Sequence, residues 1–214
     1  MREAVIQKIL EKKAIAIVRG YTPEEVLNLA KALYAGGIEL LEVTFDQKSA
    51  EARQVTVETV KLLNKELGDK MCFGTGTVTT VEMVKLTHEA GGKFVISPDM
   101  DPEVIKATRE LGMVSIPGAL TPSEIKQAYV CGADFVKVFP VNAMGVSYIK
   151  AVTAPLSHIR MLAVGGVDGG NIRNYLAAGA VGAGVASCLF KKEWIKEGQW
   201  EKITEATKEF TSLL

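Results

Sequence analysis

The sequence predicts an α/β fold, a single-domain (β/α)8 TIM barrel with an N-terminal helix. Short β-branched apolar runs alternate with helical segments, and subtracting the first residue numbers of successive runs gives spacings of 20 to 33 residues. That spacing accommodates one strand, one loop and one helix, and runs that are apolar at consecutive positions are typical of parallel strands covered on both faces. No linker rich in serine, proline or glycine divides residues 1–214, so we expect one domain. The eight predicted strands are Ala14–Val18, Ile38–Thr44, Met71–Gly74, Phe94–Ser97, Val114–Pro117, Phe135–Phe139, Ile159–Val164 and Ala180–Val185.

The helices are indicated by capping signals, taken here in chain order. Residues 1–13 mix charged with apolar positions and lack the cleavage site of a signal peptide, which predicts an amphipathic helix before the first strand. The motif Thr-Pro-x-Glu occurs at Thr22 and again at Thr121, and it combines a capping threonine, a proline at the first helical position and an acid in the first turn. We expect a later helix to begin near Asp168. The segment Lys191–Leu214 predicts one amphipathic helix that closes the outer ring.

A doubly wound open sheet is the alternative architecture. It would carry a glycine-rich phosphate-binding turn directly after the first strand. Residues 18–23 read Val-Arg-Gly-Tyr-Thr-Pro and lack that fingerprint, which favours the barrel.

Composition limits the classes of partner. Lys plus Arg and Asp plus Glu each total 25, so the net charge is zero, whereas nucleic-acid-binding domains usually carry a basic excess. No segment has the roughly 18 uninterrupted apolar residues of a membrane helix. The cysteines Cys72, Cys131 and Cys188 lie far apart among apolar neighbours, which is typical of free thiols in a reducing cytosol. We therefore expect a cytoplasmic protein with neither a nucleic-acid nor a membrane partner.

The two histidines argue against a zinc site. His88 falls in a predicted helix, and His158 precedes the seventh strand on the opposite rim of the barrel. A site with several imidazoles cannot be assembled from these two residues. Magnesium held by carboxylates stays open on this reasoning.

Two ionisable side chains interrupt the apolar strands. Lys137 lies in the middle of Phe135–Phe139, where burial lowers the pKa of an amine and leaves it able to attack a carbonyl and form a Schiff base. The alternative is a lysine that extends from the strand end to water. Strand alternation places Leu40, Glu42 and Thr44 on one face, so Glu42 is expected either to move protons near Lys137 or to form a structural salt bridge.

Glycines and polar residues follow the last strands. Gly165 and Gly166 come after the seventh strand and Ser187 after the eighth, where barrels of this kind commonly bind phosphate through backbone N–H groups. Arg19 ends the first strand, which adjoins the eighth when the barrel closes. These residues predict an anion site, with Arg19 supplying charge.

Six segments together resemble the KDPG/KHG aldolase family, whose members cleave 2-keto-3-deoxy-6-phosphogluconate or 4-hydroxy-2-oxoglutarate to pyruvate and an aldehyde. The resemblance extends from Ala14 to about Leu189. The segments are Leu41-Glu42-Val43-Thr44, Gly74-Thr75-Gly76-Thr77-Val78, Ile96-Ser97-Pro98, Ile116-Pro117-Gly118, Val136-Lys137-Val138-Phe139-Pro140 and Val164-Gly165-Gly166-Val167.

The resemblance implies a class I aldolase that needs no metal or other cofactor and is a homotrimer. Lys137 matches the Schiff-base lysine and Glu42 the general acid and base. Thr77 matches a group that binds the pyruvyl carboxylate. The remaining matches are substrate-binding residues: Phe139, and at the phosphate end Arg19, Gly165, Gly166 and Ser187. The implied partners are pyruvate and a phosphorylated keto-deoxy sugar acid.

Three positions depart from the pattern of many family members. Asp46 stands where an arginine is common, Asp99 follows Ser97-Pro98, and Val164 replaces a threonine before the glycine turn. We expect Val164 to lie near the hydroxyls of the substrate's middle carbons and to leave either C4 epimer acceptable. Two other functions stay open: a phosphosugar isomerase or epimerase with Glu42 as base and Lys137 as electrostatic stabiliser, and a non-catalytic barrel that binds sugar phosphates.

Overall fold

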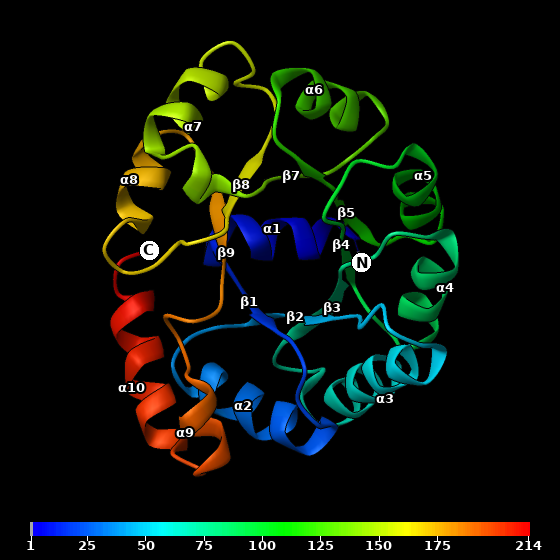
Figure 1. Cartoon of the computed structure of the whole chain (residues 1–214), viewed down its shortest axis with the longest axis vertical. Coiled ribbons are helices and arrows are strands. Elements are labelled where there is room, and N and C mark those ends of the chain that lie inside the picture. The colour runs from blue at the N-terminus through cyan, green and yellow to red at the C-terminus, as the bar shows by residue number, and fades with distance from the viewer. Residues whose placement is uncertain (1) are drawn as a thin grey trace.

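The computed structural model describes residues 2–214. Its strands pair in parallel in the order β5-β4-β3-β2-β1-β9-β8-β7-β6. Figure 1 shows these strands as a central ring with helices around it. The strands are β1 (Ala14–Val18), β2 (Leu40–Thr44), β3 (Cys72–Gly76), β4 (Phe94–Ile96), β5 (Val114–Ile116), β6 (Gly118–Ala119), β7 (Val136–Val138), β8 (Met161–Val164) and β9 (Gly182–Val185). The helices are α1 (Arg2–Lys12), α2 (Pro23–Ala35), α3 (Ala50–Leu67), α4 (Val81–Glu89), α5 (Pro102–Glu110), α6 (Pro122–Val130), α7 (Val146–Thr153), α8 (Ile172–Ala177), α9 (Lys192–Lys196) and α10 (Trp200–Thr211), with a short 3-10 helix η1 (Val141–Ala143).

The eightfold barrel is confirmed, although the strand predicted over Val114–Pro117 ends at Ile116 as β5 and a second short strand, β6, follows Pro117. β5 pairs with β4 and β6 pairs with β7, so the two segments together occupy one position in the ring. Pro117 separates them because proline has no N–H to donate to a neighbouring strand. Its carbonyl still accepts a hydrogen bond from the Lys137 N–H at 2.8 Å, which keeps the ring continuous at this point.

The Thr-Pro-x-Glu motifs mark helix starts as expected. Thr22 caps α2 and Thr121 caps α6, and in each case the glutamate three residues later hydrogen-bonds back to the capping residue's N–H. These reciprocal contacts satisfy backbone donors that have no partner inside the helix.

Two predicted helix boundaries were wrong. The helix expected near Asp168 is α8, which begins at Ile172, because the Asp168 carboxylate accepts the Gly170 N–H at 2.9 Å and folds the intervening residues into a turn. The single helix expected over 191–214 is divided into α9 and α10. Gly198 lies between them with φ +65°, a left-handed conformation that ends a helix.

Helix α1 closes the N-terminal end of the barrel. Its buried residues Val5, Ile6 and Ile9 belong to the same apolar cluster as Phe94 of β4 and Phe135, which directly precedes β7. Figure 1 shows α1 crossing the centre of the ring rather than lying in the outer layer. A larger apolar cluster lies between the strands and the surrounding helices.

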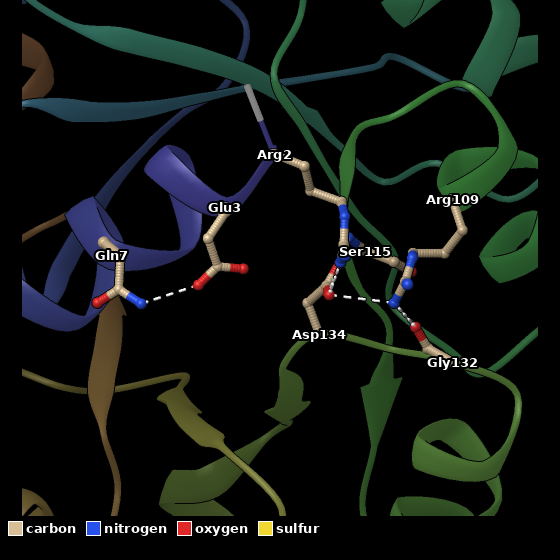
Figure 2. A network of polar contacts seen from close by, with 7 residues as sticks. All are labelled: Arg2, Glu3, Gln7, Arg109, Ser115, Gly132 and Asp134. Atoms are coloured by element: carbon tan, nitrogen blue, oxygen red, sulfur yellow. Dashed lines mark hydrogen bonds and ion pairs between the residues drawn. The ribbon is translucent and has the colours of Figure 1, made fainter.

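A carboxylate ties α1 to this end of the barrel. Asp134, just before β7, forms ion pairs with Arg2 of α1 and with Arg109 of α5, the latter at 3.1 Å. Its second oxygen accepts the Ser115 N–H at 3.0 Å. Figure 2 shows the three donors converging on Asp134. This network lies opposite the C-terminal strand ends, where the predicted catalytic groups are located.

Candidate active site

A cavity of about 400 Å³ opens at the C-terminal ends of the strands. Each residue that the sequence analysis assigned to the site lines this cavity. They are Arg19, Glu42, Thr77, Lys137, Phe139, Val164, Gly165, Gly166 and Ser187. They come from β2, β7 and β8 and from the segments that follow β1, β3, β7, β8 and β9. The barrel therefore gathers residues that lie up to 168 positions apart in the chain, the separation of Arg19 and Ser187 by subtraction.

Lys137 and Glu42 are both buried in the wall of the cavity. Lys137 is 8% exposed and Glu42 is 2% exposed. Burial lowers the pKa of Lys137 and, because it disfavours the carboxylate, raises the pKa of Glu42 to about 7; their mutual attraction opposes both shifts. The two groups thus influence each other's charge across the cavity. An amine with a lowered pKa and a carboxyl group whose pKa is raised to about 7 are suited to nucleophilic attack and to proton transfer, respectively.

The two side chains do not form the structural salt bridge that was the alternative for Glu42. No ion pair joins them in the described chain, and Glu42 Oε2 is buried without a hydrogen-bond partner. Lys137 Nζ instead lies 4.6 Å from the centre of the Phe139 ring. Both reactive groups are therefore available to a substrate that occupies the space between them.

Thr77 is held in an uncommon conformation beside these groups. Its φ is +58°, a left-handed value that is rare outside glycine and is found where surrounding contacts impose it. The Arg19 guanidinium donates to Thr77 Oγ1 at 2.9 Å, and the Gln47 amide donates to the Thr77 carbonyl at 2.6 Å. Arg19 thereby reaches from the end of β1 to the loop after β3. Arg19 hydrogen-bonds to Thr77, the residue matched to the pyruvyl carboxylate, and it also lines the same cavity as the turn at Gly165 and Gly166.

The turn after β8 depends on glycine at both positions. Gly165 has φ +104° and Gly166 φ +71°, and a Cβ atom at Gly166 would lie only 2.8 Å from Cβ of Asn142. The Asn171 amide donates to the Gly166 carbonyl at 2.9 Å. These contacts hold the turn between η1 and the start of α8, with its backbone against the cavity.

Asp46 lies away from this cavity. Its carboxylate accepts the Lys48 N–H at 2.9 Å, and it lines a separate cavity of about 410 Å³ between the ends of β1 and β2 and helices α2 and α3. The acid therefore does not face the anionic groups of a substrate bound beside Lys137.

Several lining residues were not assigned by the sequence analysis. Ile17 and Gly184 each lie one residue before the end of their strand and line the cavity, and the two-residue alternation of a strand could have indicated which positions face inward. Gln47 does not line the cavity but contacts Thr77, and it lies in an exposed loop where no motif indicates a role, so this contact is visible only in three dimensions. The other unassigned lining residues are Pro98, Val167 and Ala186.

Within residues 2–214, no group of three or more His, Cys, Asp or Glu side chains is placed to hold a metal ion. None of the helices in that range is long and apolar enough to cross a membrane.

Comparisons with known proteins agree with the resemblance in the sequence. Residues 5–206 match the sequence model of the family described as KDPG and KHG aldolase. The chain is 29% identical over 213 residues to the 2-dehydro-3-deoxy-phosphogluconate aldolase of Haemophilus influenzae, covering 99% of this chain and 97% of that protein. It is 35% identical to the 2-dehydro-3-deoxy-6-phosphogalactonate aldolase of Escherichia coli, covering 83% and 84% of the two chains.

The fold is also similar to that of a solved structure. The KDPG aldolase of Legionella pneumophila, determined with pyruvate captured as a covalent carbinolamine intermediate, superposes with a TM-score of 0.85. The two chains are 28% identical, and the match covers 97% of each. The predicted barrel is confirmed by this similarity.

Proposed function

Since the chain belongs to the KDPG and KHG aldolase family, we propose that Lys137 and Glu42 carry out its reaction. The protein is a class I aldolase, an aldehyde-lyase that releases pyruvate through a Schiff base. Its substrate is a 2-keto-3-deoxy-6-phospho sugar acid of the gluconate or galactonate series, or the smaller 4-hydroxy-2-oxoglutarate. The second product is an aldehyde, which is glyceraldehyde 3-phosphate for the phosphorylated substrates.

The first half of the reaction forms the covalent intermediate. The neutral amine of Lys137 attacks C2 of the substrate ketone to give a carbinolamine, which loses water to give an iminium. Burial supports this step because it lowers the pKa of Lys137 and raises the fraction of neutral amine. The ring of Phe139, 4.6 Å from Nζ, restricts where the amine can point.

The second half breaks and remakes bonds to carbon. The Glu42 carboxylate takes the proton of the C4 hydroxyl, the C3–C4 bond breaks, and its electron pair moves toward the iminium to leave an enamine and the free aldehyde. Protonated Glu42 then returns the proton to C3 of the enamine. Water adds to the resulting iminium, and collapse of the carbinolamine frees pyruvate and restores the amine.

The rest of the cavity holds the two anionic ends of the substrate in this proposal. Thr77 binds the pyruvyl carboxylate. The backbone of Gly165 and Gly166, together with Ser187 and the charge of Arg19, binds the phosphate. Support comes from the shared cavity and from the left-handed glycine turn, which brings backbone against the ligand space.

The observation that carries this proposal is a buried lysine and a buried glutamate that line one cavity without pairing. Borohydride reduction in the presence of pyruvate tests it, because reduction fixes an iminium as a stable secondary amine. Peptide mass mapping should find the pyruvyl adduct on Lys137. An adduct on another lysine would overturn the assignment.

We also propose that the protein acts as a homotrimer in the cytoplasm. The family resemblance supports the trimer, and helix α6 carries Tyr129 and Val130, which are 45% and 65% exposed and offer apolar surface for burial between copies. The three cysteines are free thiols, which suits a reducing compartment. Light scattering should give three times the chain mass, and Val130→Asp should lower it.

A further inference from the structure

Gly76, the last residue of β3, lies directly beside the carboxyl group of Glu42. It pairs with Thr44 of β2, two residues beyond Glu42 on the same face. A Cβ atom at Gly76 would overlap Oε1 and Cδ of Glu42 and would lie 2.7 Å from its Cγ. All three of the nearest atoms belong to Glu42. The carboxyl group therefore fills the space that a side chain at position 76 would occupy.

Backbone conformation does not explain this glycine. The φ of Gly76 lies outside the left-handed region, so its backbone is open to alanine, unlike that of the next residue, Thr77. Gly74, on the same strand face, differs in what surrounds it. A Cβ there would overlap the ring and the carbonyl oxygen of Phe94, which accounts for Gly74 by packing of the barrel wall. At Gly76 the only obstacle among the nearest atoms is the movable end of one ionisable side chain.

We infer that Gly76 is a positioning residue for the reaction, because the hollow it leaves on β3 sets where the Glu42 carboxyl group lies. This inference rests on the role proposed for Glu42. Oε1 lies against the backbone of β3 at Gly76, and Oε2 is buried without a hydrogen-bond partner, so the hollow at Gly76 is the contact that fixes this end of the side chain. A general base acts only within hydrogen-bond reach of the proton it moves, and a misplacement of about 1 Å can reduce the rate roughly 10²-fold.

The substitution Gly76→Ala separates this role from a structural one. The added methyl group displaces the Glu42 carboxyl group and leaves Lys137, on β7, unchanged. Trapping of pyruvate by borohydride, which needs the amine, should stay within about twofold of the wild type. Exchange of the pyruvate methyl protons for deuterium from solvent, which needs proton transfer at C3, should fall about 10²-fold, and kcat should fall with it while KM changes little.

A second substitution tests whether the effect runs through Glu42. Aspartate is one methylene shorter than glutamate, so Glu42→Asp should slow exchange in the wild-type background but restore part of it in the Gly76→Ala background. The matched control is Gly169→Ala, whose Cβ would lie 3.3 Å from the terminal methyl of Leu213 and whose exchange rate should be unchanged. Exchange at the wild-type rate in Gly76→Ala would overturn the inference.

Stability supplies an independent readout. If Gly76→Ala melts at a lower temperature, adding Glu42→Ala removes the overlapping atoms and should remove the loss. The inference would be overturned if Gly76→Ala lowered the melting temperature of Glu42→Ala by as much as it lowers that of the wild type, because the obstacle to the methyl group would then lie elsewhere. Failure of the wild-type enzyme to trap pyruvate would instead overturn the proposed function, and this stability comparison would still stand.

Discussion

Lys137 and Glu42 face one cavity from strands four positions apart in the ring of eight, β7 and β2. Each lies on a strand whose described residues are otherwise uncharged, and each is buried. This arrangement keeps the amine and the carboxyl group on opposite sides of the space where a substrate binds. It also explains why their electrostatic attraction does not become a direct ion pair.

Glu42→Gln should separate Schiff-base formation from proton transfer. The amide keeps the size of the side chain but cannot carry the proton, so kcat should fall by about 10²- to 10⁴-fold. Pyruvate should still be trapped by borohydride, because the Lys137 amine is retained. Steady-state kinetics and mass mapping of the same sample check both expectations, and near-normal turnover would assign the proton transfer to another group.

The free energy of unfolding should depend on pH because the Glu42 carboxyl group is buried in the folded protein. Folding raises the pKa of Glu42 from 4.5 to about 7, so between these values the folded protein holds a proton that the unfolded chain has lost. The contribution of Glu42 to the free energy of unfolding is therefore complete below pH 4.5 and is lost as the pH rises through 7.

Replacing Glu42 with Gln should remove this dependence on pH. Relative to the wild type, Glu42→Gln should gain roughly 3 kcal/mol in its free energy of unfolding between about pH 4 and pH 8. Urea denaturation of both proteins across this range measures the difference. A constant difference between the two proteins would show that the pKa of Glu42 is not raised by folding.

Val164 should permit both C4 epimers of the substrate. It lines the cavity directly before the Gly165–Gly166 turn, between the proposed phosphate site and Lys137, and valine offers no hydrogen bond to a hydroxyl. We expect the gluconate- and galactonate-derived substrates to have kcat/KM values within about an order of magnitude. Val164→Thr adds one neutral hydrogen bond, worth about 0.5–1.5 kcal/mol or roughly three- to tenfold, and should favour the gluconate epimer.

Measurement of kcat/KM for both epimers tests this expectation. Both epimers are assayed with the wild type and with Val164→Thr. A gluconate preference above about a hundredfold that the threonine leaves unchanged would place selectivity elsewhere in the cavity.

Asp134→Asn should weaken the fold without weakening the reaction. The amide retains an acceptor for the Ser115 N–H but loses the ion pairs with Arg2 and Arg109. Because both arginines are about one-third exposed, we expect a loss of about 1–2 kcal/mol in the free energy of unfolding. Urea denaturation checks the loss against Asp69→Asn at an exposed position, and kcat should be unchanged because Asp134 lies at the opposite end of the barrel. A fall in kcat would contradict this expectation, because it would show that Asp134 affects the reaction from the opposite end of the barrel.

Periodicity predicted most of the fold, since each apolar run overlaps a strand of the barrel. The exceptions are local. Pro117 lacks an N–H and separates β5 from β6. The Asp168 carboxylate folds its own loop into a turn, so α8 begins only at Ile172. Neither effect changes the pattern of apolar residues, so periodicity alone does not show them.

The site was predictable where function depends on a charged side chain within an apolar strand. Lys137 and Glu42 stand out as charges in apolar runs, and the topology then places them at one rim. Contacts between residues from different strands were not predictable. The hollow at Gly76 and the hydrogen bond from Gln47 to Thr77 depend on how neighbouring strands and loops meet, which no single segment encodes.

The central claim is that Lys137 forms the Schiff base, and borohydride reduction with pyruvate tests it most directly. We expect one pyruvyl adduct per chain, located on the peptide that contains Lys137. Lys137→Ala should remain folded but should carry no adduct and lose aldol cleavage. The exposed Lys150 serves as the matched control, because Lys150→Ala should be labelled like the wild type. Labelling of Lys137→Ala, or wild-type labelling confined to another lysine, would contradict the account.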